Sequence, residues 1–251
     1  ETHTNGSWAA EDYMTAIELA VANHPTVKDL RHTFIHGQME ERQIVERSVG
    51  KYDELDATAK MYRDLSGTAR QEGTDTDAHG KQWTASDLRA ALQNGKLIKD
   101  QNLVSSYFIN HTYFWGDRHY EMFLGQDRAE RISPLRSALK RGIPFSNHND
   151  TFVTPIDPLL SVWSAVNRIT SSGQVLGEEY TISVMDALRS VTSWAAYQAC
   201  EERIKGSLEP GKLADFVILE ANPLTVAKET IKDIGISATI VGDEVVYGSL
   251  D

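Results

Sequence analysis

Three histidines and one aspartate stand where four strand-like segments of the sequence end. They are His3, His36, His111 and Asp150, and His148 lies two residues before the last of them. Imidazole and carboxylate groups hold catalytic divalent ions of the zinc type, with one position left open for water. Such an ion lowers the pKa of that water toward ~7, which makes hydroxide available near neutral pH. These residue types therefore indicate a metal-dependent hydrolytic site.

Each of these residues also has a purely structural interpretation. His3 lies two residues from the start of the printed chain and could be frayed, and His36 ends a buried type of strand. The aromatic neighbours of His111 are typical of a core histidine, and Asp150 could cap the loop before Pro155. The remaining histidines lie in helix ends or polar segments and are not expected to take part: His24, His32, His79 and His119.

The apolar pattern indicates the elements that would position these residues. Strands are expected within 30–38, 102–111 and 143–150, and helices within 7–23, 40–49, 133–142 and 183–202, the last capped by Ser183. From about residue 204 strands dominate, with a hairpin at "VGDEVV". This order predicts an α/β domain over 1–203 and a small β appendage over 204–251. A polar insertion over about 51–100 is expected to be a solvated surface segment or, alternatively, a lid.

Composition excludes several classes of partner. The formal net charge of -11 and the pI of about 5.2 argue against nucleic acid and against an anionic membrane surface. The single cysteine, Cys200, excludes a disulfide within the chain and a cysteine-based zinc site. No apolar run approaches the ~18 residues of a membrane span, and no secretory signal opens the sequence. A cytoplasmic location is therefore expected, whereas composition does not identify a substrate.

Five stretches, taken in order, resemble the amidohydrolase superfamily and more closely its family 3 branch. They are "THTNGS", "RHTFIHGQ", "NHTYFWGDRH", "FSNHNDTFVTPIDPLLSVWSAVNR" and "GSLEPGKLADFVIL". The resemblance covers nearly the whole chain. It implies the second half of a metal-dependent (β/α)8 TIM barrel, in which the carboxyl ends of all strands open on one face. Residues 204–251 would then be strands of a small β-sandwich.

The resemblance also implies specific roles. His3 and His36 would bind a divalent metal, expected to be zinc with one or two ions left open, together with Asp150. Asp150 would act as general base toward water and pass the proton to the leaving nitrogen. His111 would stabilise the developing oxyanion. The substrate pocket or the surroundings of the metal would be formed by His148, Trp115, Asp117 and Arg118. The implied reaction is hydrolysis of a non-peptide carbon–nitrogen bond in a small-molecule substrate, such as an amide or formamide.

Two departures from the family pattern bear on this hypothesis. Ser7 stands where the family has an acid, which affects the surroundings of His3. The first-strand His-x-His pair and the fourth-strand Lys or Glu of the family are not in these 251 residues. A half barrel would expose unpaired sheet edges, so three arrangements are expected as alternatives: self-association, a separate chain that supplies the first half, or these residues being a piece of a longer chain. The alternative is a catalytically silent barrel fragment that serves assembly or binding.

Overall fold

Four parallel strands form the main sheet. The computed structural model describes residues 2–3, 16–17, 20, 23, 33–36, 75–76, 82–83, 104–140 and 142–250. The strands are β1 (Thr2–His3), β2 (Thr33–His36), β5 (Val104–Tyr107) and β6 (Phe145–Asn147), and they pair in that order. Sequential parallel neighbours need crossover connections between them, so the sheet is of the α/β type expected from the sequence.

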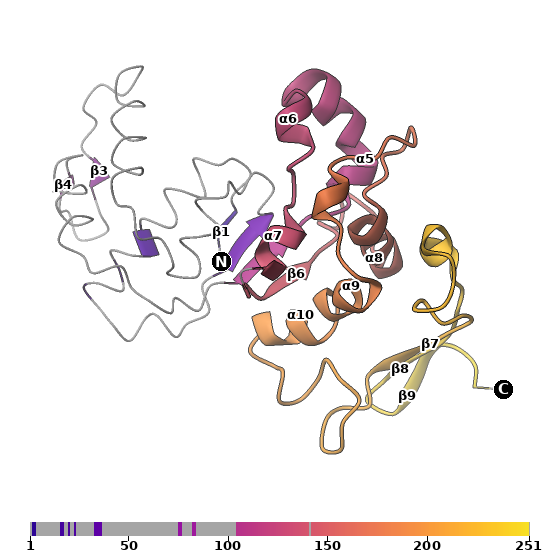
Figure 1. The fold of residues 1–251 in the computed structure, drawn as a ribbon. Coiled ribbons are helices and arrows are strands. Elements are labelled where there is room, and N and C mark those ends of the chain that lie inside the picture. Colours follow the sequence, from indigo (N-terminus) through magenta and orange to yellow (C-terminus); the bar gives the residue numbers. More distant parts are fainter. Residues whose placement is uncertain are drawn as a thin grey trace.

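One face of β5 and β6 packs against helices. Tyr107 and Phe145 are fully buried, and their rings meet edge to face at 5.7 Å. The surrounding helices are α7 (Leu135–Lys140), α8 (Pro158–Asn167), α9 (Val184–Ser190) and α10 (Ser193–Gln198), which lie around β6 in Figure 1. Leu135, Leu160 and Ala187 bring three of these helices into the same apolar core. This burial fixes the position of the two strands.

The start and the end of α8 follow from its sequence. The Asp157 side chain accepts a hydrogen bond from the Leu160 N–H at 2.9 Å, and Pro158 occupies the first turn, where no N–H partner is needed. The helix ends at Arg168, whose φ of 52° is left-handed. Eight of the residues of this helix are buried, so α8 packs into the core along most of its length.

Arg168 is a fully buried cation that joins two loops to α8. Its guanidinium donates to the carbonyl oxygens of Leu176 (2.6 Å), Ile132 (2.8 Å), Ser133 (3.1 Å) and Glu130 (3.2 Å). Burial lowers its pKa to about 10, while the nearby negative charge of Glu179 acts in the opposite direction. The group remains charged at neutral pH, and its donors hydrogen-bond these carbonyl groups, of which that of Ser133 also accepts from the Leu135 N–H at 2.8 Å.

The single helix expected over 183–202 is two helices. Ser183 caps α9 as predicted, since its hydroxyl accepts from the Asp186 N–H at 3.1 Å. The helix stops after Ser190, and α10 begins at Ser193 with Thr192 at φ -130° and ψ -96°. The Thr192 hydroxyl donates to the Leu188 carbonyl at 2.7 Å, a local bond that competes with the helix ladder. Two β-branched residues at the junction, Val191 and Thr192, favour the break.

A second sheet lies in the C-terminal part of the chain (Figure 1). The antiparallel strands β7 (Phe216–Leu219), β8 (Ile236–Val241) and β9 (Glu244–Gly248) pair in sequence order. The turn residues Gly242 and Asp243 have φ of 57° and 69°, as a type I′ hairpin requires, so the predicted hairpin is confirmed. The short 3-10 segment η4 (Lys228–Asp233) packs on α8 through the buried Ile231.

Two further observations concern the earlier residues. Within the predicted polar insertion, β3 (Asp75–Thr76) and β4 (Gln82–Trp83) form a short antiparallel pair. Of the helix predicted over 7–23, residues 16, 17, 20 and 23 are helical, whereas the helix predicted over 40–49 lies outside the described residues. No helix in the described part of the chain is long and apolar enough to cross a membrane.

Candidate functional site

The carboxyl ends of the four parallel strands lie at nearly the same level. His36 is in register with Tyr107, which is in register with Asn147, and His3 pairs one residue earlier with Ile35. The chain therefore leaves all four strands at one edge of the sheet, the edge at which parallel α/β proteins bind ligands. The side chains of His3 and His36 lie outside what the structure describes. Their assignment as metal ligands stays a prediction.

Asp150 lies three residues beyond the end of β6. Its φ of 51° is left-handed, and its carbonyl oxygen accepts from the N–H groups of Val153 (2.8 Å) and Thr154 (3.3 Å). In the described part of the chain, its half-buried carboxylate makes no hydrogen bond or ion pair. Across that same part, no three His, Cys, Asp or Glu side chains come together as a metal site. The turn thus presents an acid whose side chain is not used to stabilise the turn.

The residue before Asp150 is held by two side chains from other elements. The Asn149 Oδ1 atom accepts from Asn110 Nδ2 at 2.9 Å and from Ser161 Oγ at 3.0 Å. The Thr154 hydroxyl donates to the Asn149 carbonyl, closing the turn. Asn110 is fully buried, and its Oδ1 has no hydrogen-bond partner within the described residues. Asn110 therefore joins the end of β5 to the Asp150 turn and retains one unused acceptor.

His111 does not end a strand, as expected from the sequence, but begins a helix. β5 stops at Tyr107, and α5 runs over His111–Arg118 into the π-helical turn η2 (His119–Phe123). Trp115, Asp117 and Arg118, expected on a loop, consequently lie on α5. The His111 N–H donates to the Phe108 carbonyl, and the Thr112 N–H donates to the Ile109 carbonyl. The turn that follows the strand therefore continues directly into the helix.

Sequence reasoning left His119 out, yet it is paired with His111. The Nδ1 atom of His111 lies 3.1 Å from Nε2 of His119, and the two rings are stacked at 5.3 Å. Burial lowers the pKa of His119, which keeps its ring neutral near pH 7. A neutral ring can complete an N–H···N bond with one donor and one acceptor. The signal was available, because both histidines fall in the "NHTYFWGDRH" stretch that carried the family resemblance.

The Asp117 carboxylate is hydrogen-bonded to two serines of the loop that follows α8. Its carboxylate accepts from Ser172 Oγ (2.6 Å), Ser172 N–H (3.1 Å) and Ser171 Oγ (3.1 Å). Burial acts to raise the pKa of this carboxyl, but bonds from Ser172, Thr170 and Ser171 together leave the pKa below its ordinary value. Asp117 fixes the loop after α8 to α5. Its expected contribution to a substrate pocket stays a prediction.

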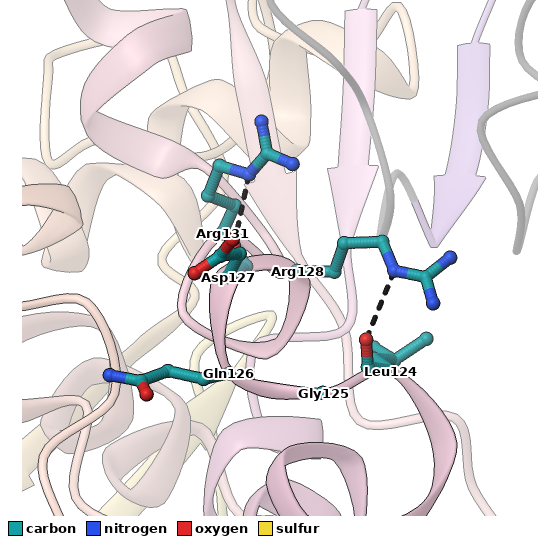
Figure 2. A pocket seen from close by; sticks show the side chains of 6 residues that line it. All are labelled: Leu124, Gly125, Gln126, Asp127, Arg128 and Arg131. Atoms are coloured by element: carbon teal, nitrogen blue, oxygen red, sulfur yellow. Dashed lines mark hydrogen bonds between the residues drawn. The ribbon is translucent and has the colours of Figure 1, made fainter.

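A surface hollow of about 440 Å³ lies beyond η2, at the short helix α6 (Gln126–Ala129), as Figure 2 shows. In it the Arg128 Nε donates to the Leu124 carbonyl at 3.0 Å, and the Arg131 Nε to the Asp127 carbonyl at 3.1 Å. None of the residues predicted for the metal or the substrate lines this hollow. It is a feature of the α6 surface, separate from the strand ends.

Comparison with known proteins identifies the family. A family model described as the amidohydrolase family matches residues 1–247, and the chain belongs to this family. It is 28% identical over 127 residues to YtcJ of Bacillus subtilis (strain 168) and 27% identical over 128 residues to the N-substituted formamide deformylase of Arthrobacter pascens. These matches take in 49% and 51% of this chain but only 24% and 23% of the relatives. The aligned part is thus about a quarter of each relative's length.

Solved structures agree on the fold. An uncharacterised metal-dependent hydrolase from Pyrococcus horikoshii OT3 superposes with a TM-score of 0.57 at 18% identity, over 90% of this chain and 34% of that chain. A second one, from Pyrococcus furiosus, gives a TM-score of 0.53 at 17% identity, over 89% and 33%. The arrangement of strands and helices is therefore shared with metal-dependent hydrolases.

Proposed function

We propose that this chain forms the second half of a TIM-barrel site that hydrolyses non-peptide carbon–nitrogen bonds, such as those of amides or formamides. The observation that supports the proposal is the common level of the four strand ends: His3 and His36 end β1 and β2, and His111 and Asp150 follow shortly after β5 and β6. Membership of the amidohydrolase family supports the reaction class. The small β7–β9 sheet would be part of the accompanying β-sandwich.

The donor set suits a divalent ion. Two imidazoles and one carboxylate, His3, His36 and Asp150, are ligands that zinc accepts, and the Asp150 carboxylate has no competing ion pair in the described part of the chain. When bound, such an ion polarises a carbonyl group and makes water acidic enough to attack near neutral pH. Replacing His36 by Ala should lower the metal content of the purified protein, and an unchanged metal stoichiometry would contradict the assignment.

Residues of this chain would carry out the proton transfer and stabilise the negative charge of the reaction. Asp150 takes a proton from the attacking water as the water oxygen bonds to the carbonyl carbon. Asp150 then delivers that proton to the leaving nitrogen as the C–N bond breaks. His111 donates a hydrogen bond to the oxygen that becomes negative. The unused Oδ1 of Asn110, buried beside this edge, offers an acceptor for a water or a substrate N–H. Trp115, tilted against His111 at 5.0 Å, would limit the volume next to the carbonyl.

A test of the proposed function measures bound metal and hydrolysis together. The complete protein, loaded with zinc, should release amine from a panel of small amides and formamides, and chelation should abolish the release. Hydrolysis that survives complete metal removal, or a loaded protein inactive on every C–N substrate, would overturn it.

A second candidate is a catalytically silent subunit for assembly or binding. The observation that favours it is the exposed apolar surface of the small sheet, where Val217, Val246 and Tyr247 expose 50%, 58% and 62% of their area. Apolar patches on sheets mark contact surfaces. Self-association, or pairing with a chain that supplies the first barrel half, would cover them. Sedimentation of the purified chain measures its mass directly, and a silent subunit would assemble while binding no metal.

A further inference from the structure

The residues that immediately precede His111 and Asp150 are joined by a hydrogen bond. Asn110 Nδ2 donates to Asn149 Oδ1 at 2.9 Å, across 39 positions of the sequence. Asn110 is the N-cap residue of α5 and is fully buried, yet its side chain makes no capping bond to the helix. An asparagine at an N-cap ordinarily accepts from an N–H of the first turn. The Asn110 amide is used instead for a contact between the segments that follow β5 and β6.

A second bond to the same acceptor comes from helix α8. The Ser161 hydroxyl lies 3.0 Å from Asn149 Oδ1 and 3.4 Å from the Asp157 carbonyl, so its shorter contact is the one with Asn149. An amide oxygen has two lone pairs, and two donors occupy them here. Ser161 and Asn110 are both fully buried, so water cannot readily replace either donor. The Asn149 side chain is therefore held from two separate elements.

The backbone of the Asp150 turn depends on such support. The left-handed φ of 51° at Asp150 is unfavourable for a residue with a Cβ atom, and it persists where the surrounding bonds over-determine it. The Asn149 carbonyl accepts from the Thr154 hydroxyl, and the Asp150 carbonyl accepts from the N–H groups of Val153 and Thr154. None of these bonds uses the Asp150 carboxylate. Its direction is thus set by the turn, and the turn is held through Asn149.

We propose that Asn110, Asn149 and Ser161 are positioning residues that fix the Asp150 carboxylate relative to His111. The catalytic part of this inference rests on the proposed function, in which Asp150 transfers the proton and His111 faces the carbonyl. A general base must lie within about 2.6–3.2 Å of the atom whose proton it takes. Because the Asn110–Asn149 bond is one residue away from each of the two groups, it limits how far they can move apart.

Hydrogen exchange reads the hold on the turn without any substrate. Ser161→Ala in the complete protein should speed exchange of the Val153 and Thr154 amides on the order of tenfold, because the turn loses a bond and opens more often. Ser164→Ala is the matched control. Ser164 lies one turn further along α8 and is equally buried, and its hydroxyl has no hydrogen-bond partner within the described residues. Exchange of the two amides should keep the wild-type rate in this control.

Ser161→Ala is the decisive variant because it leaves the Asn110 side chain in place. Asn110→Ala should also speed exchange of the two amides, but it removes the unused Oδ1 acceptor as well. The inference is overturned where the amides of Ser161→Ala exchange no faster than those of Ser164→Ala.

Steady-state kinetics then test whether the hold on the turn serves turnover. Ser161→Ala should lower kcat on the order of tenfold with a much smaller change in KM, and Ser164→Ala should not. In an Asp150→Asn background the same substitution should have no further effect, since the base is already absent. An equal loss in both backgrounds would refute action through Asp150. A complete protein that hydrolyses no C–N bond would overturn the proposed function, whereas the exchange rates would still decide whether Ser161 holds the turn.

Discussion

The two faces of the β5–β6 strand pair have opposite chemistry. Toward the helices, Tyr107 and Phe145 are fully buried in an apolar core. On the other face, Ser106 and Ser146 form hydrogen bonds that lead to His148 and to Gln198 of α10, a helix that also contacts Phe145 through Trp194. Apolar burial supplies free energy without specifying a direction, whereas hydrogen bonds fix the orientation of a ring and contribute little net stability. One face therefore stabilises the fold, and the other positions groups beside the strand ends.

Replacement of Asp150, the acid that follows β6, should have the largest effect on turnover. Asp150→Asn should lower turnover on the order of 10²–10⁴-fold, because an amide cannot accept the proton from water. Asn tolerates the left-handed backbone at this position, so the free energy of unfolding should change little. Asp243→Asn is a matched control, since Asp243 also has a positive φ but lies in the β8–β9 turn. Turnover like that of the wild type would refute the role of Asp150.

The largest effect on stability should come from the opposite face. Phe145→Ala should reduce the free energy of unfolding by about 3–5 kcal/mol, because it leaves a cavity among Tyr107, Trp194 and the helices. Urea denaturation followed by circular dichroism measures this loss. Phe152→Ala removes a side chain that is fully exposed and should stay within about 0.5 kcal/mol of the wild type. Equal losses in both variants would contradict the division between the two faces.

A buried cation behaves as part of the core. Arg168→Met should reduce the free energy of unfolding by about 2–3 kcal/mol, since four carbonyl oxygens lose a donor, although that of Ser133 keeps its bond from the Leu135 N–H. The control is Arg189→Met, whose guanidinium is half exposed and pairs with Asp186 at 3.0 Å, a pair worth less than ~1 kcal/mol. Thermal unfolding of the two variants under identical conditions separates the contributions. Similar Tm values would show that the Arg168 contacts are not important for stability.

The pair formed by His111 of α5 and His119 of η2 should affect turnover more than folding. His119→Phe removes the partner of His111 Nδ1 and should lower kcat about tenfold with little change in KM, because the ring that faces the carbonyl loses its orientation. His119→Gln keeps a nitrogen donor and should recover most of the rate. Steady-state kinetics of both variants decide this. A Gln variant as slow as the Phe variant would count against the hydrogen bond.

The smallest expected effect is the pH dependence contributed by Asp117. Hydrogen bonds hold its folded pKa below the ordinary 3.8, so its contribution to stability is present above about pH 4 and is lost as the pH falls through the lower folded value. Asp117→Asn should remove this dependence. The measurement compares urea midpoints of the wild type and the variant between pH 5 and pH 3. Parallel curves over that range would contradict the assigned sign.

Local patterns determined most of the elements. The Ser183 cap of α9 and the Gly242-Asp243 turn act within a few residues, so the sequence was sufficient to predict them. The break at Val191–Thr192 and the helical start at His111 were not predicted. In both places several residues favour two conformations about equally, and packing selects one of them.

The sequence by itself determined the family and the order of the parallel strands, because motifs and apolar periodicity depend on residues close together in the chain. Only the tertiary structure decided that His119 contacts His111, that Asn110 holds Asn149, and that a serine pair links His148 to Gln198. These contacts join side chains that lie 8 to 52 positions apart. A hydrogen bond over such a separation depends on how the strands and helices pack, which no local pattern specifies.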